Sequence, residues 1–235
     1  MNTQSHYAAA RVLAALLSYP DEPLRVQLPE LQQALQTDTV LSSECRASVA
    51  ALIESLRQAE PLEAEARYVD TFDRGRRTSL HLFEHVHGDS RDRGPALIDL
   101  QETYAQQGMF LAPGELPDFL PAVLEFAAMQ PYARAQEFLG EMAHLLQSIH
   151  AALARQSSPY AVVVAAVLDL AGEPVAPVDT VPEPPAEPAL DEQWAEPAAF
   201  GGCSAAGQKA TPDVQTIQIV RRETAPARLS EGSLA

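Results

Sequence analysis

The chain has 235 residues, a net charge of −16 with histidine neutral, and two cysteines. Such an acidic chain repels nucleic-acid phosphates, and two cysteines provide neither a disulfide framework nor a zinc site. The sequence opens without a signal-peptide pattern and its apolar runs are too short to span a bilayer, so we expect a cytoplasmic protein without stable membrane insertion.

Composition divides the chain into two parts. Residues 1–172 are long enough to bury roughly 70% of the unfolded surface, whereas residues 173–235 contain nine of the nineteen prolines and many acidic residues. We therefore predict a folded domain over 1–172 and a flexible tail over 173–235, disordered and extended from Glu173 to Pro188. Within the tail, Trp194, Phe200 and Cys203 mark a docking segment, and residues 216–220 are suited to pair with a strand edge. The alternative is an extension without a partner.

Apolar residues recur at helical spacing throughout the first part. The pattern predicts helices over 7–19, around 28–35, from Ser42 or Ser43 through 56, from 61 to Gly75, over 80–86, from 89 or 90 to Gly108, over 118–129, over 132–154 and from 158 to Gly172. The last of these is apolar on nearly every side, which predicts its burial. Alternating strand patterns are absent before the tail. The fold class is therefore all-α, a globular bundle of about eight or nine helices.

Two apolar strips flanked by acids suggest a binding groove. The strips are Leu120 and Leu124 beside Asp118 and Glu125, and Tyr68 and Phe72 beside Asp70 and Asp73. Asp118 and Glu125 are seven residues apart, so on one helix they lie within about 20° of the same line. Facing strips of this kind form an apolar floor with an acidic rim, which fits a basic amphipathic helix. The alternative is that the apolar residues are core and that Asp118 is a helix cap.

A metal-dependent hydrolase is the enzymatic alternative. His81, Glu84 and His85 have the H-x-x-E-H spacing that places two zinc ligands and a base on one helical face. No third ligand is evident, and glycines at 75 and 88 bound the segment. Several neighbouring basic residues are suited either to local ion pairs and caps, which we favour, or to contact with a nucleotide-type cofactor: Arg74, Arg77, His85, His87, Arg91 and Arg93.

Four motifs together carry a family resemblance. They are Tyr-x3-Phe-Asp-Arg-Gly from Tyr68, Ser-Leu-x-Leu-Phe-Glu-His-Val-His-Gly from Ser79, Ser-Arg-Asp-Arg-Gly from Ser90, and Glu-Leu-Pro-Asp-x-Leu-Pro-x-x-Leu-Glu-Phe from Glu115. They closely resemble the NarJ-type assembly chaperones of respiratory nitrate reductase, a branch of the TorD-like molybdoenzyme chaperones. The resemblance covers most of residues 1–172. It departs at Phe119, where the family pattern has histidine, and at His81, where the pattern usually has an apolar residue.

The resemblance implies an all-α chaperone that is not an enzyme and has no cofactor of its own. Such a chaperone binds the N-terminal segment of the nitrate reductase catalytic (alpha) subunit while the iron–sulfur cluster and molybdenum cofactor are inserted, with molybdenum cofactor biosynthesis proteins as further partners. Carried over by motif, the peptide-contact residues are Tyr68, Phe72, Leu82, Phe83, Glu84, Asp118, Leu120, Leu124 and Glu125. Because Phe119 replaces histidine, a pH-dependent role of that position is in question. Another molybdoenzyme, such as an N- or S-oxide reductase, is the alternative client.

Overall fold

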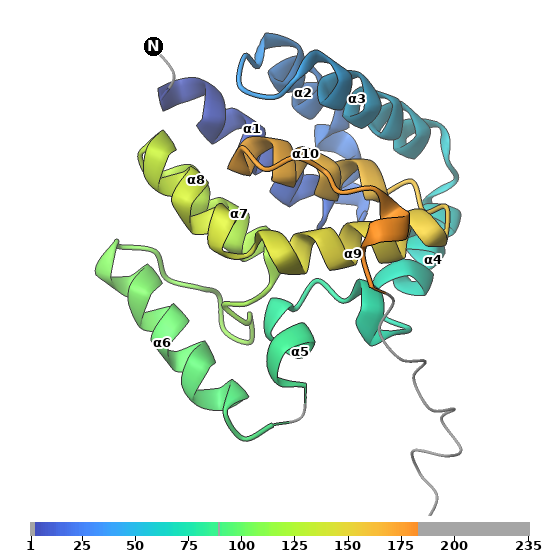
Figure 1. Ribbon diagram of the computed structural model, residues 1–235. Coiled ribbons are helices and arrows are strands. Elements are labelled where there is room, and N and C mark those ends of the chain that lie inside the picture. Colours follow the sequence, from blue (N-terminus) through green and yellow to red (C-terminus); the bar gives the residue numbers. More distant parts are fainter. Residues whose placement is uncertain (1–2, 89, 183–235) are drawn as a thin grey trace, which may run out of the picture. The chain divides into compact units, whose positions relative to one another are not determined.

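The computed structural model describes residues 3–88 and 90–182 (Figure 1). They belong to one compact unit, Met1–Pro185. In the part described, the regular structure is helical, and the one isolated β-bridge joins His81 to Phe119. The elements are α1 (Thr3–Leu16), α2 (Glu22–Thr37), α3 (Ser43–Gln58), α4 (Pro61–Phe72), η1 (Arg76–Thr78), α5 (Leu82–His87), α6 (Arg93–Gln106), α7 (Leu120–Met129), α8 (Tyr132–Glu141), α9 (Ala143–Arg155), α10 (Ala161–Ala171) and η2 (Val178–Thr180). The predicted all-α class is confirmed.

Local caps explain where several helices begin and end. Asp21 accepts a hydrogen bond of 2.9 Å from the Leu24 amide at the start of α2, and Ser42 caps α3 as predicted. Gly172 ends α10 with a φ of 78°, in the left-handed region that favours glycine. The helix predicted over 132–154 is instead two helices, because the chain leaves helical geometry at Met142. Gly140 weakens the helix just before that break.

The core surrounds α10, which packs against α1, α3, α8 and α9 (Figure 1). Its residues Val163, Val164, Val167 and Leu168 are fully buried, so the predicted burial of this helix is confirmed. Helix α7 packs chiefly against α1 and is also buried on most sides. Among the described residues, no helix combines the length and apolar character needed to cross a membrane.

Residues 173–182 run along α9. The Gln147 side chain donates a hydrogen bond of 2.7 Å to the Pro174 carbonyl, and Arg155 donates to the Val178 carbonyl at 2.9 Å. Polar side chains of α9 therefore bind part of the backbone of these ten residues, and the disorder expected of the tail stays a prediction. The predicted domain boundary at 172 stays a prediction. The other predictions for the tail lie outside the described residues: Trp194, Phe200, Cys203 and 216–220.

Candidate functional site: a buried polar junction and an acidic groove

Two of the family-like segments meet at one point of the structure. The Leu120 amide donates to the Leu80 carbonyl at 2.8 Å, and the Leu82 amide donates to the Asp118 carbonyl at 3.0 Å. These two bonds form the antiparallel bridge between His81 and Phe119. Segments that lie far apart in the sequence are thereby joined just before α5 and α7 begin.

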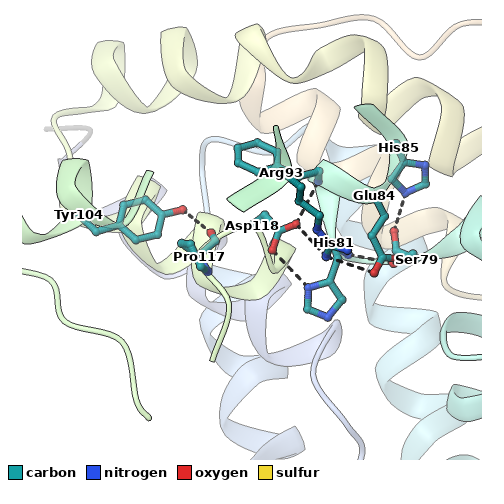
Figure 2. Close-up of polar contacts among 9 residues, drawn as sticks. Ser79, His81, Glu84, His85, Arg93, Tyr104, Pro117 and Asp118 are labelled. Carbon is teal, nitrogen blue, oxygen red and sulfur yellow. Dashed lines mark hydrogen bonds and ion pairs between the residues drawn. The ribbon is translucent and has the colours of Figure 1, made fainter. Parts of the chain in front are cut away.

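Asp118 is the centre of this contact, and we call it and its polar partners the Asp118 junction (Figure 2). Its side chain is fully buried, and Oδ2 accepts a hydrogen bond of 3.1 Å from the Phe83 amide in the first turn of α5. No side chain at the start of α5 itself supplies a cap. The Asp118 carboxylate therefore caps α5 from another part of the chain, and its charge suits the positive end of that helix.

Two basic side chains approach the buried carboxylate. His81 Nδ1 lies 3.4 Å from Asp118 Oδ1, and Arg93 Nη2 lies 3.7 Å from Oδ2. The same Arg93 nitrogen donates to Glu84 Oε1 at 3.2 Å (Figure 2). Because a buried charge is costly unless it is paired, these partners explain how Asp118 is accommodated.

Ser79 completes the junction from the other side. Its hydroxyl donates to Glu84 Oε2 at 2.6 Å, and its backbone carbonyl accepts from His85 Nε2 at 2.8 Å (Figure 2). Glu84 and His85 are thus engaged in holding the turn between η1 and α5. Their contacts are structural ones.

The metal-hydrolase hypothesis gains no support from this geometry. His81 precedes α5, so it does not share a helical face with Glu84 and His85 as the H-x-x-E-H motif requires. The three side chains point to different partners: Asp118, the Arg93–Ser79 pair and the Ser79 carbonyl. Within residues 3–88 and 90–182, no group of three His, Cys, Asp or Glu side chains is placed to hold a metal ion.

The groove predicted between the Tyr68 and Asp118 segments is not open in this structure. The apolar residues assigned to it are core residues: Tyr68, Phe72, Leu82, Leu120 and Leu124. Tyr68 donates to the Leu17 carbonyl at 2.8 Å and contacts the Phe72 and Tyr160 rings. Burial raises the pKa of the Tyr68 phenol. The alternative interpretation of these residues, as core, is the one that the structure supports.

The predicted pairing of Asp118 with Glu125 also needs correction. Helix α7 begins at Leu120, so Asp118 lies outside it and the helical-face argument does not apply. Glu125, by contrast, is partly exposed on α7 and forms an ion pair of 3.3 Å with Arg11 of α1. The Asp118 carboxylate is therefore buried, whereas the Glu125 carboxylate is accessible to solvent.

Two of the remaining predicted basic residues make local contacts of the structural kind that we favoured. Arg74 pairs with Asp70 at 3.0 Å within the α4 region, and the His87 ring contacts the Phe83 ring edge-on at 5.7 Å. Arg77 belongs to η1, and Arg91 is exposed in the turn before α6.

An open hollow of about 660 Å³ does exist nearby, and we call it the α1–α7 groove. It lies between the α1–α2 corner, α7 and the loop of residues 107–119 that joins α6 to α7. Its larger apolar lining residues are Tyr19, Leu24, Met109, Phe110, Leu111, Phe119 and Met129. The charged residues that line it in the described structure are all acidic: Asp21, Glu115 and Glu125.

Large apolar side chains are unusually exposed along this groove. Phe110 is 81% exposed, Met129 is 50% exposed and Tyr19 is 44% exposed. Exposed apolar surface rimmed by polar groups is typical of interaction sites. A second hollow of about 480 Å³ between α6, α7 and α8 includes Phe83, but Arg134 stands among its acids. Of the two hollows, the α1–α7 groove therefore matches a cationic apolar segment better.

The sequence pattern identified Glu125 as a peptide contact but not most of the other residues that line this groove. Phe110 was the available signal, because a large aromatic residue in a loop rich in proline and glycine rarely serves the core. Tyr19 gave no signal beyond the end of a predicted helix, and Asp21 gave none. Their role depends on α1 and α7 being packed together, which periodicity does not reveal.

The structure also clarifies the Phe119 substitution. His81 and Phe119 face each other across the β-bridge, with ring centroids 5.2 Å apart. His81 therefore brings an imidazole to Asp118 from the opposite segment, while Phe119 lines the α1–α7 groove. The two departures from the family pattern are thus neighbours in space.

Comparison with known proteins places these features in a family. The model of the family described as "Nitrate reductase delta subunit" matches residues 20–166. The chain is 40% identical over 181 residues to the nitrate reductase molybdenum cofactor assembly chaperone NarJ of Escherichia coli K12, covering 77% of this chain and 76% of that protein. It is 36% identical over 162 residues to the probable chaperone NarW of the same strain, covering 69% and 67% respectively.

A more distant relative supports the same assignment. The chain is 32% identical over 161 residues to the probable nitrate reductase molybdenum cofactor assembly chaperone NarJ of Bacillus subtilis 168, covering 68% of this chain and 86% of the relative. All three relatives are named as assembly chaperones and not as catalysts, in agreement with a chain that is not an enzyme. Motifs, fold and comparisons agree, and the chain belongs to the nitrate reductase delta subunit family.

Proposed function

We propose that this chain is an assembly chaperone that binds the N-terminal segment of the respiratory nitrate reductase catalytic subunit. It holds the apoenzyme in the cytoplasm while the iron–sulfur cluster and the molybdenum cofactor are inserted, before membrane attachment. Proteins of molybdenum cofactor biosynthesis are further partners in this proposal. The relatives support the chaperone role, since each is named as a nitrate reductase molybdenum cofactor assembly chaperone or a probable one.

The α1–α7 groove is the observation that carries the peptide-binding part of the proposal. Its apolar lining includes the exposed Phe110, and its charged lining consists of Asp21, Glu115 and Glu125. An amphipathic segment fits such a surface when its apolar residues recur at i, i+3 and i+4 and its other face carries lysine or arginine. The acidic balance of the whole chain favours the approach of such a segment.

The two parts of the groove contribute differently to binding. Apolar contact supplies most of the affinity, at roughly 25 cal/mol per Å² of apolar surface removed from water. Exposed ion pairs contribute about 0–1 kcal/mol each, but they orient the segment and accelerate its association. Micromolar binding, about −8 kcal/mol, is enough to hold the client and still release it when the folding client buries its segment elsewhere.

The Asp118 junction acts as the scaffold of this groove. It fixes the segment before α7 against the start of α5, and Phe119 in that segment lines the groove. The residues of the family-like motifs that form this junction thus hold the binding surface in place. Glu125 alone among the predicted peptide contacts lies on this groove.

A calorimetric titration of the full chain tests the proposal. The probe is a synthetic peptide with the N-terminal sequence of the nitrate reductase catalytic subunit from the same organism. We expect a Kd of about 1 μM or below, which corresponds to about −8 kcal/mol. A matched peptide with each lysine and arginine replaced by glutamate is expected to bind at least tenfold more weakly.

Two further peptides define the specificity of the client. A scrambled peptide of the same composition keeps the charge and loses the i, i+3, i+4 apolar spacing, so we expect weak binding. The leader of an N- or S-oxide reductase tests the alternative client class. Tighter binding of that leader, or equal binding of the authentic and scrambled peptides, would contradict the proposed function.

A further inference from the structure

One rim carboxylate of the α1–α7 groove already has a cationic partner within the chain. Arg11 Nε lies 3.3 Å from Glu125, and both side chains are about half exposed, 51% and 41% respectively. Glu125 lines the groove, together with Ala14 and Ala15 one turn beyond Arg11 on α1. Arg11 therefore stands at the edge of the groove and engages one of its three acids.

Tyr7 holds Arg11 in this position. The Arg11 guanidinium donates a hydrogen bond to the Tyr7 hydroxyl and lies 5.3 Å from the centre of the Tyr7 ring. Tyr7 is one helical turn before Arg11, so the two side chains share a face of α1. The cation–π contact offsets part of the entropic cost of ordering an exposed arginine.

We propose that Arg11 is a built-in counterion, which occupies Glu125 in the empty groove and is displaced by an arginine or lysine of the bound client. This inference rests on the proposed function and adds a step to it. A client guanidinium offers Glu125 the same pairing that Arg11 provides, so the exchange of one exposed pair for another is nearly balanced. Arg11 consequently lowers the affinity for a client cation at this point and facilitates release of the client by returning to Glu125.

The test measures the Kd of the nitrate reductase N-terminal peptide for four forms of the full chain: unaltered, Arg11→Gln, Glu125→Gln and the double variant. With Arg11 removed, Glu125 meets the client without a competitor, so Arg11→Gln is expected to tighten binding about twofold to fivefold. In the Glu125→Gln background the same substitution is expected to change the Kd by less than a factor of about 1.5. This dependence on Glu125 distinguishes displacement from simple charge repulsion.

Arg57→Gln is the matched control. Arg57 forms a comparable exposed pair with Glu54 on α3, at 2.9 Å, and it does not line the groove. The control changes the net charge by the same amount and is expected to leave the Kd unchanged. Unchanged or weaker binding by Arg11→Gln, equal tightening in the Glu125→Gln background, or equal tightening by Arg57→Gln would each overturn the inference. If the unaltered chain fails to bind the peptide, the proposed function fails and the inference fails with it.

Discussion

The carboxylate of Asp118 caps helix α5 through a hydrogen bond of 3.1 Å from the amide of Phe83, a residue 35 positions before it. Sequence-local caps usually lie within three residues of the amide they satisfy. This one instead ties α5 to the segment that leads into α7. The start of α5 thus depends on the tertiary contact between the two family-like segments.

The Asp118 cap predicts a stability effect. Asp118→Ala removes the acceptor of the Phe83 amide and a counter-charge of Arg93, so we expect the free energy of unfolding to fall by about 1–3 kcal/mol. Asp118→Asn keeps an oxygen for the amide and is expected to lose less. Urea unfolding followed by circular dichroism measures both variants. Equal midpoints for Asp118→Ala and the unaltered chain would exclude the cap.

The same burial changes how Asp118→Lys is interpreted. If Asp118 were a rim residue of an open groove, this substitution would weaken peptide binding several-fold by reversing a rim charge. Because Asp118 is fully buried, a lysine there is expected to destabilise the fold, and weaker binding then reports on folding.

Phe110 tests the apolar lining of the groove. Since this side chain is 81% exposed, Phe110→Ala is expected to leave the free energy of unfolding within about 0.5 kcal/mol of that of the unaltered chain. Loss of its contact with the client is expected to weaken peptide binding by about 1–2 kcal/mol, roughly fivefold to thirtyfold. Leu62→Ala is the matched control, because Leu62 is 79% exposed on α4 and does not line the groove. Equal Kd values for the two variants would contradict a role for Phe110.

Glu115 tests the acidic rim through its salt dependence. Glu115→Lys places a cation beside the client's cations, so we expect several-fold weaker binding at about 20 mM salt. The difference is expected to shrink at about 500 mM salt because the charges are then screened. Glu102→Lys on α6 changes the net charge equally, is exposed and does not line the groove. A salt-independent loss, or an equal loss for Glu102→Lys, would count against electrostatic recognition by the rim.

Tyr68 separates the core interpretation from the peptide-contact interpretation. Tyr68→Phe leaves the Leu17 carbonyl without its 2.8 Å hydrogen bond, which is expected to cost about 0.5–1.5 kcal/mol of unfolding free energy. For a domain of this size Tm then falls by about 2–4 °C per kcal/mol. The Kd for the peptide is expected to stay unchanged, because the side chain is buried. A higher Kd with an unchanged Tm would instead indicate that Tyr68 contacts the peptide.

His150 predicts a pH dependence of stability. Burial on α9 lowers the pKa of this imidazole below its ordinary value of 6.5, and its Nδ1 atom is buried without a hydrogen-bond partner. The unfolded chain therefore binds a proton more readily than the folded chain does. The contribution of His150 to stability is present above about pH 6.5 and is lost as the pH falls through the lowered folded-state pKa.

The measurement compares urea midpoints at pH 7.5 and pH 5.5. His150→Leu is expected to lose less stability over this interval than the unaltered chain, because the proton-linked term has been removed. His144→Leu is the control for replacing an imidazole by leucine, since His144 is exposed on the same helix. Parallel slopes for His150→Leu and the unaltered chain would contradict the prediction.

The sequence by itself determined the helical class, most helix positions and the family. Helical periodicity is a local property, and so are the cap at Ser42 and the left-handed stop at Gly172. The family-like motifs are also written in consecutive residues. The apolar character of α10 was enough to predict its burial, because a helix that is apolar all round has no face for solvent.

Only the tertiary structure decided which apolar strips are core and which are surface. Tyr68 and Leu124 each belong to an apolar strip with the spacing of a binding face. Periodicity does not show whether such a strip is covered by a partner or by another helix of the same chain. Packing of α7 on α1 buried the predicted strip and left Glu125 beside Arg11. The groove residues come from α1, α2, α7 and a loop, so their proximity is a product of helix packing and no local pattern encodes it.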